Sequence, residues 1–195
     1  MVSTTLAPGL LLAAPRLGDR NFERTVVLMG HHDHDGALGW VLNGQPLVPV
    51  RQLLQEAALV PPGVVLPATP SFDAPACVGG PVMSGSAWLL FEREPSLPDY
   101  ESAHDLGCGF AVTGARAAIE AVASGQGPRV FRLLLGYAGW GPGQLEGEIG
   151  AGGWLPASID RSLLSTLELD RLWDTAYSLS GTSPMAFSSP TRGSA

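Results

Sequence analysis

Five consecutive polar residues, from His31 to Asp35, combine imidazole and carboxylate side chains, the groups that bind transition metals in proteins. Neighbouring residues on a strand point to opposite faces, so His31 and His32 cannot both reach one ion. His31 and His34 are therefore weak metal candidates. Because short motifs of this kind often occur without a function, we favour a solvated hairpin tip here and expect neither a metal nor another cofactor.

A glycine-rich segment at residues 136–143 is the second candidate, because a loop between a strand and a helix can aim backbone N–H groups at an anion. It contains Trp140 and is followed by Gln144. Neither a phosphate-binding lysine nor a G-x-G-x-x-G pattern accompanies it, so a tight turn is the favoured interpretation. Gly79 and Gly80 predict either a bulge or a place where a ligand approaches the backbone, and the bulge is favoured.

The residue types of nucleophilic catalysis are present without the spacing that catalysis needs. Ser84 and Ser86 flank Gly85, but no G-x-S-x-G elbow and no histidine motif marks a base for them. Glu146 and Glu148 fall two positions apart on a predicted helix, where they point about 200° apart and cannot act as a carboxylate pair. We expect both glutamates to lie on solvated helix surface.

The elements that must position these residues follow from hydrophobic patterning. Apolar runs bounded by turn residues predict strands at residues 9–14, 25–30, 37–42, 76–78, 87–91, 109–113 and 130–135. Helical spacing predicts helices at residues 49–59, 115–124, 144–149 and 167–179. Asp35 and Gly36 predict a hairpin turn, which places residues 31–35 at a loop tip, and the proline-rich residues 61–75 predict an irregular crossing. Strands and helices that do not alternate regularly indicate an α+β fold.

Length and composition predict one domain with a short tail. A chain of 195 residues with 45% hydrophobic residues can bury one sizeable core. Residues 182–195 are mostly Ser, Thr, Pro, Gly and Ala, which predicts a flexible C-terminal tail.

Charge and cysteine content restrict the partners and the compartment. A net charge of −7 and the absence of lysine argue against direct binding of nucleic acid and exclude a Schiff-base or P-loop lysine. The first apolar stretch is interrupted by Pro8 and Gly9, which argues against a signal peptide or a membrane span. Cys77 and Cys108 lack metal-binding spacing and are expected to be reduced thiols. We therefore expect a cytoplasmic protein without a membrane partner.

Several longer strings point to a known family when they are taken together. PGLLLAAP (residues 8–15), DRNFERTVVL (19–28), GALGWVLN (36–43), GGPV (79–82) and LGYAGWGPGQLEGEI (135–149) occur in this order. Together they closely resemble the AlgH/YqgE family of small bacterial proteins, from about Pro8 to Leu179. The resemblance implies a compact α+β domain over residues 1–181, with a mixed, largely antiparallel sheet that curls toward a barrel and helices packed outside. It implies a proposed regulatory role but no settled activity, catalytic residues or cofactor.

The chain departs from the family pattern at two places. Members usually carry a basic residue and a proline directly after the asparagine, whereas Asn43 is followed by Gly44, Gln45 and Pro46. Members also commonly end a later strand with Leu-His, where this chain has Leu90 and Phe91. If these positions form a family site, this member has altered it.

Two functional hypotheses remain open from the sequence. The favoured one is a non-enzymatic binding or regulatory protein that holds an unidentified protein or small molecule. The alternative is an enzyme or ligand-binding protein whose site gathers Asn43, Gly79, Gly80, Trp140 and Gln144, with His31 as a candidate base. Convergence of these residues in one concave pocket would favour the alternative.

Overall fold

A computed structural model describes residues 5–187 of the chain. In this part of the protein ten strands join one mixed sheet. In chain order the strands are β1 (Gly9–Ala13), β2 (Val26–Asp33), β3 (Gly36–Val41), β4 (Pro46–Pro49), β5 (Pro75–Val78), β6 (Val82–Glu92), β7 (His104–Asp105), β8 (Phe110–Thr113), β9 (Phe131–Trp140) and β10 (Trp154–Ala157). The sequence missed the short strands β4 and β7.

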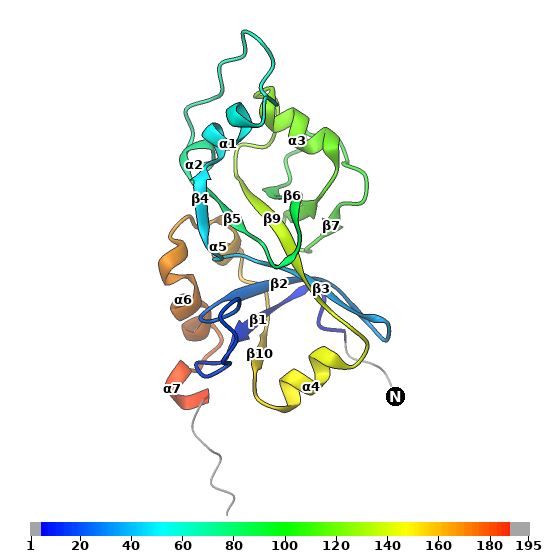
Figure 1. Cartoon of the computed structure of the whole chain (residues 1–195), viewed down its shortest axis with the longest axis vertical. Coiled ribbons are helices and arrows are strands. Elements are labelled where there is room, and N and C mark those ends of the chain that lie inside the picture. The colour runs from blue at the N-terminus through cyan, green and yellow to red at the C-terminus, as the bar shows by residue number, and fades with distance from the viewer. Residues whose placement is uncertain (1–4, 188–195) are drawn as a thin grey trace, which may run out of the picture.

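The sheet follows the order β10-β1-β2-β3-β9-β6-β8-β7, and β4 and β5 branch from it beside β9. Its neighbouring strands are antiparallel except for the parallel pair of β5 and β9. Figure 1 shows β2 and β3 running across the direction of β9, so the sheet curls strongly. Within the described residues the strand path keeps two ends and does not close into a barrel. The predicted α+β class with a mixed, largely antiparallel sheet is confirmed.

The long strand β9 joins the two parts of the sheet. Its residues 131–137 pair with β6, whereas its last residues, 138–140, pair with β3. The predicted tight turn at residues 136–143 is therefore wrong in its first half, because the strand continues to Trp140. Gly136 has a φ of 73°, so it accommodates a local change of backbone direction without ending the strand.

Helices cover both faces of the sheet. They are α1 (Val50–Glu56), α2 (Pro70–Asp73), α3 (Arg116–Ala123), α4 (Gln144–Gly150), α5 (Arg161–Ser165), the 3₁₀ turn η1 (Leu169–Arg171), α6 (Leu172–Leu179) and α7 (Pro184–Phe187). The sequence missed α5, and the predicted irregular crossing at residues 61–75 contains the one-turn helix α2. The last predicted helix begins at Leu172 rather than at residue 167, because residues 169–171 adopt the tighter 3₁₀ geometry.

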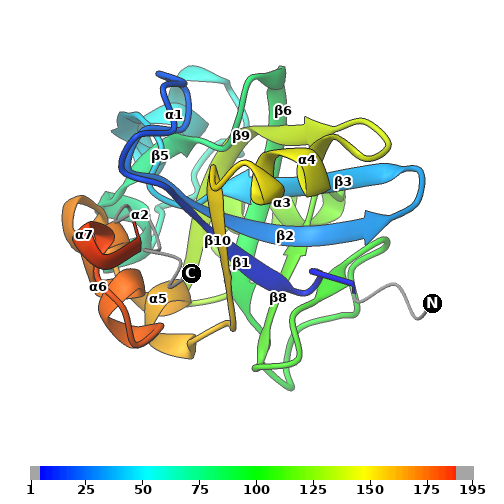
Figure 2. The ribbon, with the colours of Figure 1, turned by 90° about the horizontal axis from the view of Figure 1, so that it is seen from below.

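Alternating side chains of the first strands enter two different parts of the core. Leu28 and Trp40 belong to a buried cluster that also contains residues of α5 and α6, such as Trp173. Val27, on the opposite face of β2, belongs to a cluster with Leu145 of α4. Figure 2 shows β10, β1, β2 and β3 side by side, with α5 and α6 grouped at one end. Burial on both faces explains why β1 and β2 begin as continuous apolar runs.

A buried arginine ties β9 to the turn after β3 and to α5. The guanidinium of Arg132 donates hydrogen bonds to the backbone carbonyls of Leu42, Leu163 and Leu164. Burial lowers the pKa of Arg132 to about 10, so the group is still charged at neutral pH. It is held by carbonyl dipoles rather than by a carboxylate.

The C-terminal segment contains one further short helix. The expected flexible tail, residues 182–195, includes α7, whose Phe187 ring lies 6.2 Å from that of Tyr177; residues 188–195 fall outside the described part.

Cys77 is buried, Cys108 is half-buried, and both are free thiols. Across residues 5–187, each helix is too short or too polar to span a membrane.

Candidate functional site

A cleft of about 430 Å³ opens beside Trp88, where β6, β8 and the start of α3 meet. We call it the Trp88 cleft. It is lined by Ser86, Ala87, Trp88, Glu101, Ser102, His104, Gly114 and Ala115. Antiparallel pairing sets this arrangement, because β8 lies between β6 and β7. Figure 1 shows β6, β7 and α3 gathered in the same half of the molecule.

The Trp88 ring is held in place from its own strand and from the core. Its indole N–H donates to Ser86 Oγ at 3.1 Å, and the Ser86 hydroxyl donates to the Met83 carbonyl at 2.8 Å. The ring also packs on Trp40, with 5.0 Å between ring centroids. A Cβ atom at Gly114 would lie 3.2 Å from the six-membered ring of Trp88, so the glycine allows the backbone after β8 to pack closely on that ring.

His104 gives the cleft a neutral imidazole. The half-buried ring is hydrogen-bonded to the backbone of Gly30, and it lies 5.4 Å from the Trp40 ring. Burial lowers the pKa of His104; the Gly30 bond opposes this change, and nearby His31 adds a smaller lowering. A neutral imidazole that donates one N–H to a carbonyl keeps its other nitrogen as an acceptor. Sequence reasoning missed His104, because residues 93–108 carried no predicted element and the contact with Gly30 spans 74 positions.

The groups around the cleft are suited to binding more than to nucleophilic attack. The Ser86 hydroxyl donates its hydrogen bond to the Met83 carbonyl. Among the described residues, no hydrogen bond joins Ser86 to His104. Glu101 also lines the cleft, and its backbone carbonyl accepts the Thr113 hydroxyl at 3.1 Å. An activated serine needs a base within hydrogen-bond reach, which this arrangement lacks.

Asn43 is one of the five residues of the predicted site, and its side chain is hydrogen-bonded to the backbone. Its Oδ1 atom accepts from the Val26 N–H at 2.8 Å, and its Nδ2 atom donates to the Arg24 carbonyl at 2.9 Å. The residue lines a separate groove of about 500 Å³ between the β3–β4 connection and η1. Its side chain joins the end of β3 to the start of β2.

Gly79 and Gly80 lie buried where β5 leaves the sheet and β6 begins. A Cβ atom at Gly79 would lie 2.5 Å from the Gly136 carbonyl oxygen, and one at Gly80 would lie 2.1 Å from the Tyr137 carbonyl carbon. The two glycines therefore allow a close approach of protein backbone, and that backbone fills the space that a ligand would need.

Trp140 and Gln144 do meet, at Glu148 of α4. The Trp140 indole donates to Glu148 Oε2 at 3.0 Å, and the Gln144 amide donates to Oε1 at 2.9 Å. The Trp154 indole donates to the same Oε2 atom at 2.7 Å. The expectation that Glu148 is solvated surface is therefore wrong, because the half-buried carboxylate joins two indoles.

The five sequence-predicted residues do not gather in one place. Trp140 pairs with Ala37 near the start of β3, whereas Asn43 follows the end of that strand, where the Gly79 carbonyl accepts the Val41 N–H at 2.8 Å. At about 3.3 Å per residue, the two ends of β3 lie too far apart for one small molecule to contact both.

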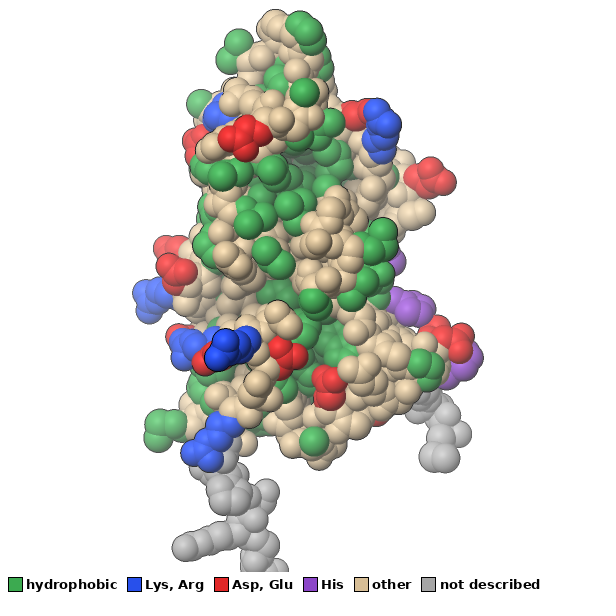
Figure 3. All heavy atoms as spheres, in the orientation of Figure 1, with side chains coloured by type: hydrophobic (Ala, Val, Ile, Leu, Met, Phe, Trp, Pro, Cys, Tyr) green, Lys and Arg blue, Asp and Glu red, His purple; other side chains and the backbone are tan. Residues whose placement is uncertain are grey.

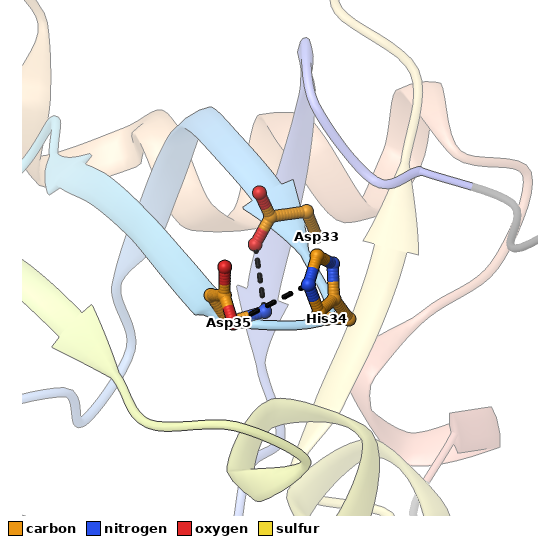
Figure 4. A group of neighbouring side chains, drawn as sticks. All are labelled: Asp33, His34 and Asp35. Atoms are coloured by element: carbon orange, nitrogen blue, oxygen red, sulfur yellow. Dashed lines mark hydrogen bonds and ion pairs between the residues drawn. The ribbon is translucent and has the colours of Figure 1, made fainter.

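The polar cluster at residues 31–35 lies partly on a strand. β2 extends to Asp33, so only His34 and Asp35 form the turn, which corrects the expected loop tip. Ligand atoms of Asp33, His34 and Asp35 lie within 4.8 Å of one another (Figure 4). Asp33 Oδ1 already accepts the Asp35 N–H at 2.8 Å, and His31 lies 2.9 Å from Asp33 Oδ2. Figure 3 shows histidine side chains at the edge of the molecule over this hairpin, where solvent reaches them.

His31 and His32 do point to opposite faces, as the strand pattern predicts. Their side chains are 57% and 5% exposed, respectively. His32 Nδ1 accepts the Leu6 N–H at 3.1 Å, so its Nε2–H is the donor to Glu146 Oε1 at 3.1 Å. Glu146 is exposed, as expected, but it also anchors a buried histidine.

Comparison with known proteins gives consistent results. The family model described as AlgH-like matches residues 10–185. A UPF0301 protein of Anaeromyxobacter dehalogenans is 39% identical over 184 residues, covering 93% of this chain and 91% of the relative. A UPF0301 protein of Rhizobium meliloti is 37% identical over 181 residues, covering 91% and 88%, respectively.

Two solved structures are also similar. The solution structure of the AlgH protein from Pseudomonas aeruginosa gives a TM-score of 0.71 at 28% identity, covering 100% of this chain and 98% of the other. A crystal structure of a Corynebacterium diphtheriae protein gives a TM-score of 0.70 at 22% identity, covering 94% and 92%, and it supports the fold alone.

Proposed function

The chain belongs to the AlgH-like family, and from that premise we propose that it is a non-enzymatic binding protein that holds a small molecule in the Trp88 cleft. The observation that carries this proposal is a half-buried His104, with a lowered pKa, in one concavity with the Trp88 ring. A concave site with an aromatic wall and a few convergent polar groups is the usual form of a small-ligand site.

The arrangement of the polar groups supports binding over turnover. Ser86 is hydrogen-bonded to Trp88 and Met83. In the alternative site, the amide of Asn43 is hydrogen-bonded to two backbone groups. A regulatory role would follow if occupancy of the cleft changed what the protein contacts. We place this activity in the cytoplasm, where free thiols such as Cys77 and Cys108 persist.

The test is a thermal-shift screen of metabolites against the wild-type protein and the Gly114→Ala variant. A ligand at 100 times its Kd stabilises the folded state by about 2.7 kcal/mol, which is readily seen as a rise in Tm. The alanine methyl group would lie 3.2 Å from the Trp88 ring, which forces the ring that forms one wall of the cleft to shift. We expect the shift to be lost in this variant.

The matched control is Gly147→Ala, whose added methyl group meets nothing within 4 Å. It should keep the full ligand-induced shift. A shift of equal size in Gly114→Ala would contradict the Trp88 cleft as the site. Conversion of the ligand to a product by the wild-type protein would contradict the non-enzymatic assignment.

A further inference from the structure

The Trp88 cleft lies where the ladder between β6 and β8 ends. Leu89 and Thr113 are the last residues that pair in that ladder. The same antiparallel register, continued by two residues, would place Ala87 opposite Ala115, and both of these residues line the cleft. Trp88 lines it from the other face of β6, because side chains alternate along a strand. The cleft is therefore at the edge of β6, beyond the end of β8.

The hydrogen-bond pattern shows which way the backbone of Ala87 points. In β6 the Glu92 N–H donates to the Val130 carbonyl, next to β9, and the following residue, Arg93, donates to the Gly109 carbonyl on the β8 side. Successive residues of a strand alternate in this way between the two neighbouring strands. The register with β9 has no shift between residues 87 and 92. Ala87 therefore directs its N–H and its carbonyl toward the side of β8, as Arg93 does.

The residue that would pair with Ala87 makes other hydrogen bonds. The Ala115 N–H donates to Thr113 Oγ1 at 3.0 Å, and the Ala115 carbonyl accepts the Ala118 N–H at 3.0 Å in the first turn of α3. Within residues 5–187, the N–H and the carbonyl of Ala87 have no hydrogen-bond partner. Unpaired backbone groups at a sheet edge are a template for another extended chain.

We infer that the ligand of the Trp88 cleft is a short extended peptide whose backbone pairs with Ala87. One peptide residue takes the place of Ala115: its N–H donates to the Ala87 carbonyl, and its carbonyl accepts the Ala87 N–H. Addition of a strand to an open sheet edge is a recurring mode of peptide recognition. This inference rests on the proposed binding function and specifies its ligand class.

The composition of the cleft favours an internal peptide segment. Its lining contains no arginine, and the whole chain contains no lysine, so the cleft lacks the cations that usually hold a terminal carboxylate. The cleft volume of about 430 Å³ suits a few residues. The fitting probe is therefore a short peptide without charged ends.

A panel of capped tripeptides, with an acetyl group at one end and a dimethylamide at the other, tests the class on the wild-type protein. The tightest binder is compared with its all-ester analogue, which keeps the shape and the carbonyls and has no N–H group. Calorimetric titration should show the ester binding roughly tenfold more weakly, because the Ala87 carbonyl is left without a donor.

Amide hydrogen exchange measures the contact at Ala87 itself. In the free protein the Ala87 N–H should exchange faster than the N–H of Leu89, which pairs with Thr113. Saturation with the peptide should slow exchange at Ala87 by a much larger factor than at Leu89. Ala87→Pro removes the N–H that faces the cleft, a change that strand edges tolerate, and should weaken the peptide roughly tenfold. Gly147→Ala, outside the cleft, should bind it as the wild type does.

Gly114→Ala separates this inference from the proposed function, because it should abolish binding of every ligand of the cleft. If the ester binds the wild type as tightly as the peptide and both are lost in Gly114→Ala, the binding function stands and the backbone pairing is overturned. The same conclusion holds if no peptide binds while another metabolite binds the cleft. If neither the peptides nor any metabolite binds, both proposals fail.

Discussion

Single side chains take their roles from the backbone groups that they contact. His104 donates to Gly30, His32 accepts from Leu6, and Asn43 spans Val26 and Arg24. In each pair the partner lies 17 or more positions away along the chain. The hydrogen bonds of His32 and Asn43 hold backbone segments in place, whereas His104 also lines the cleft.

The lowered pKa of His104 makes stability depend on pH. At pH values just below 6.5, the ordinary pKa of histidine, His104 is protonated in the unfolded chain but stays largely neutral in the folded protein. The free energy of unfolding therefore falls as the pH drops through that window. Urea unfolding at pH 7.5, 6.5 and 5.5 should show a steeper fall for the wild type than for His104→Gln.

His34→Gln serves as the comparison, because His34 is exposed in the hairpin turn. It should retain the pH dependence of the wild type. The groups that act on His104 are the Gly30 backbone and His31, so neither is changed in this experiment. Equal slopes for His104→Gln and the wild type would mean that burial does not perturb this histidine.

Among the elements, β9 makes a very close backbone contact with the segment that leads into β6. Its residue Gly136 packs against Gly80 at the start of β6, and a Cβ atom at either position would meet the backbone of the other strand within 2.5 Å. The sequence predicts a tight turn at Gly136 and a bulge at Gly80, and either feature would interrupt a strand. The structure uses them instead to bring two backbones close together.

Gly80→Ala tests this contact. Gly80 has a φ of 152°, which disfavours any side chain, and the new methyl group would collide with the Tyr137 backbone. We expect a loss of more than about 3 kcal/mol of folding free energy, seen as a lower urea midpoint or as insoluble expression. Gly85→Ala, within β6 and with open space around it, should fold like the wild type. Similar stability of the two variants would refute the close-approach explanation.

For the whole molecule, the decisive contact is the one between Arg132 and three carbonyls. It joins the strand that bridges the sheet to the loop after β3 and to α5. These segments are separated by as many as 90 residues, so the guanidinium helps to hold the N-terminal and C-terminal parts of the fold together.

Arg132→Met should destabilise the whole domain by more than about 3 kcal/mol, because each buried carbonyl left without a donor costs about 1–3 kcal/mol. Arg132→Lys should fall between the wild type and the methionine variant, since an ammonium group lacks the planar fork. Chemical denaturation followed by tryptophan fluorescence gives the comparison. Arg129→Met, at a side chain that is 87% exposed, is the control; a loss as small as that of the control would show that Arg132 is dispensable.

The sequence by itself determined those elements that depend on the pattern of neighbouring residues. The hairpin of β2 and β3, the amphipathic α1 and α3, the α+β class and the family resemblance all follow from residues close together in the chain. Strand ends were less predictable, since β6 and β9 extend through glycines that are typical of turns.

Only the tertiary structure decided which of the eye-catching residues serve the fold and which face a cleft. Asn43, Gly79, Gly80 and Trp140 stand out in the sequence, yet each is committed to a protein contact. His104 and Trp88 do not stand out, yet they line the cleft. The physical reason is that burial, pKa and free hydrogen-bonding capacity depend on neighbours brought together by folding, and a single sequence does not specify those neighbours in advance.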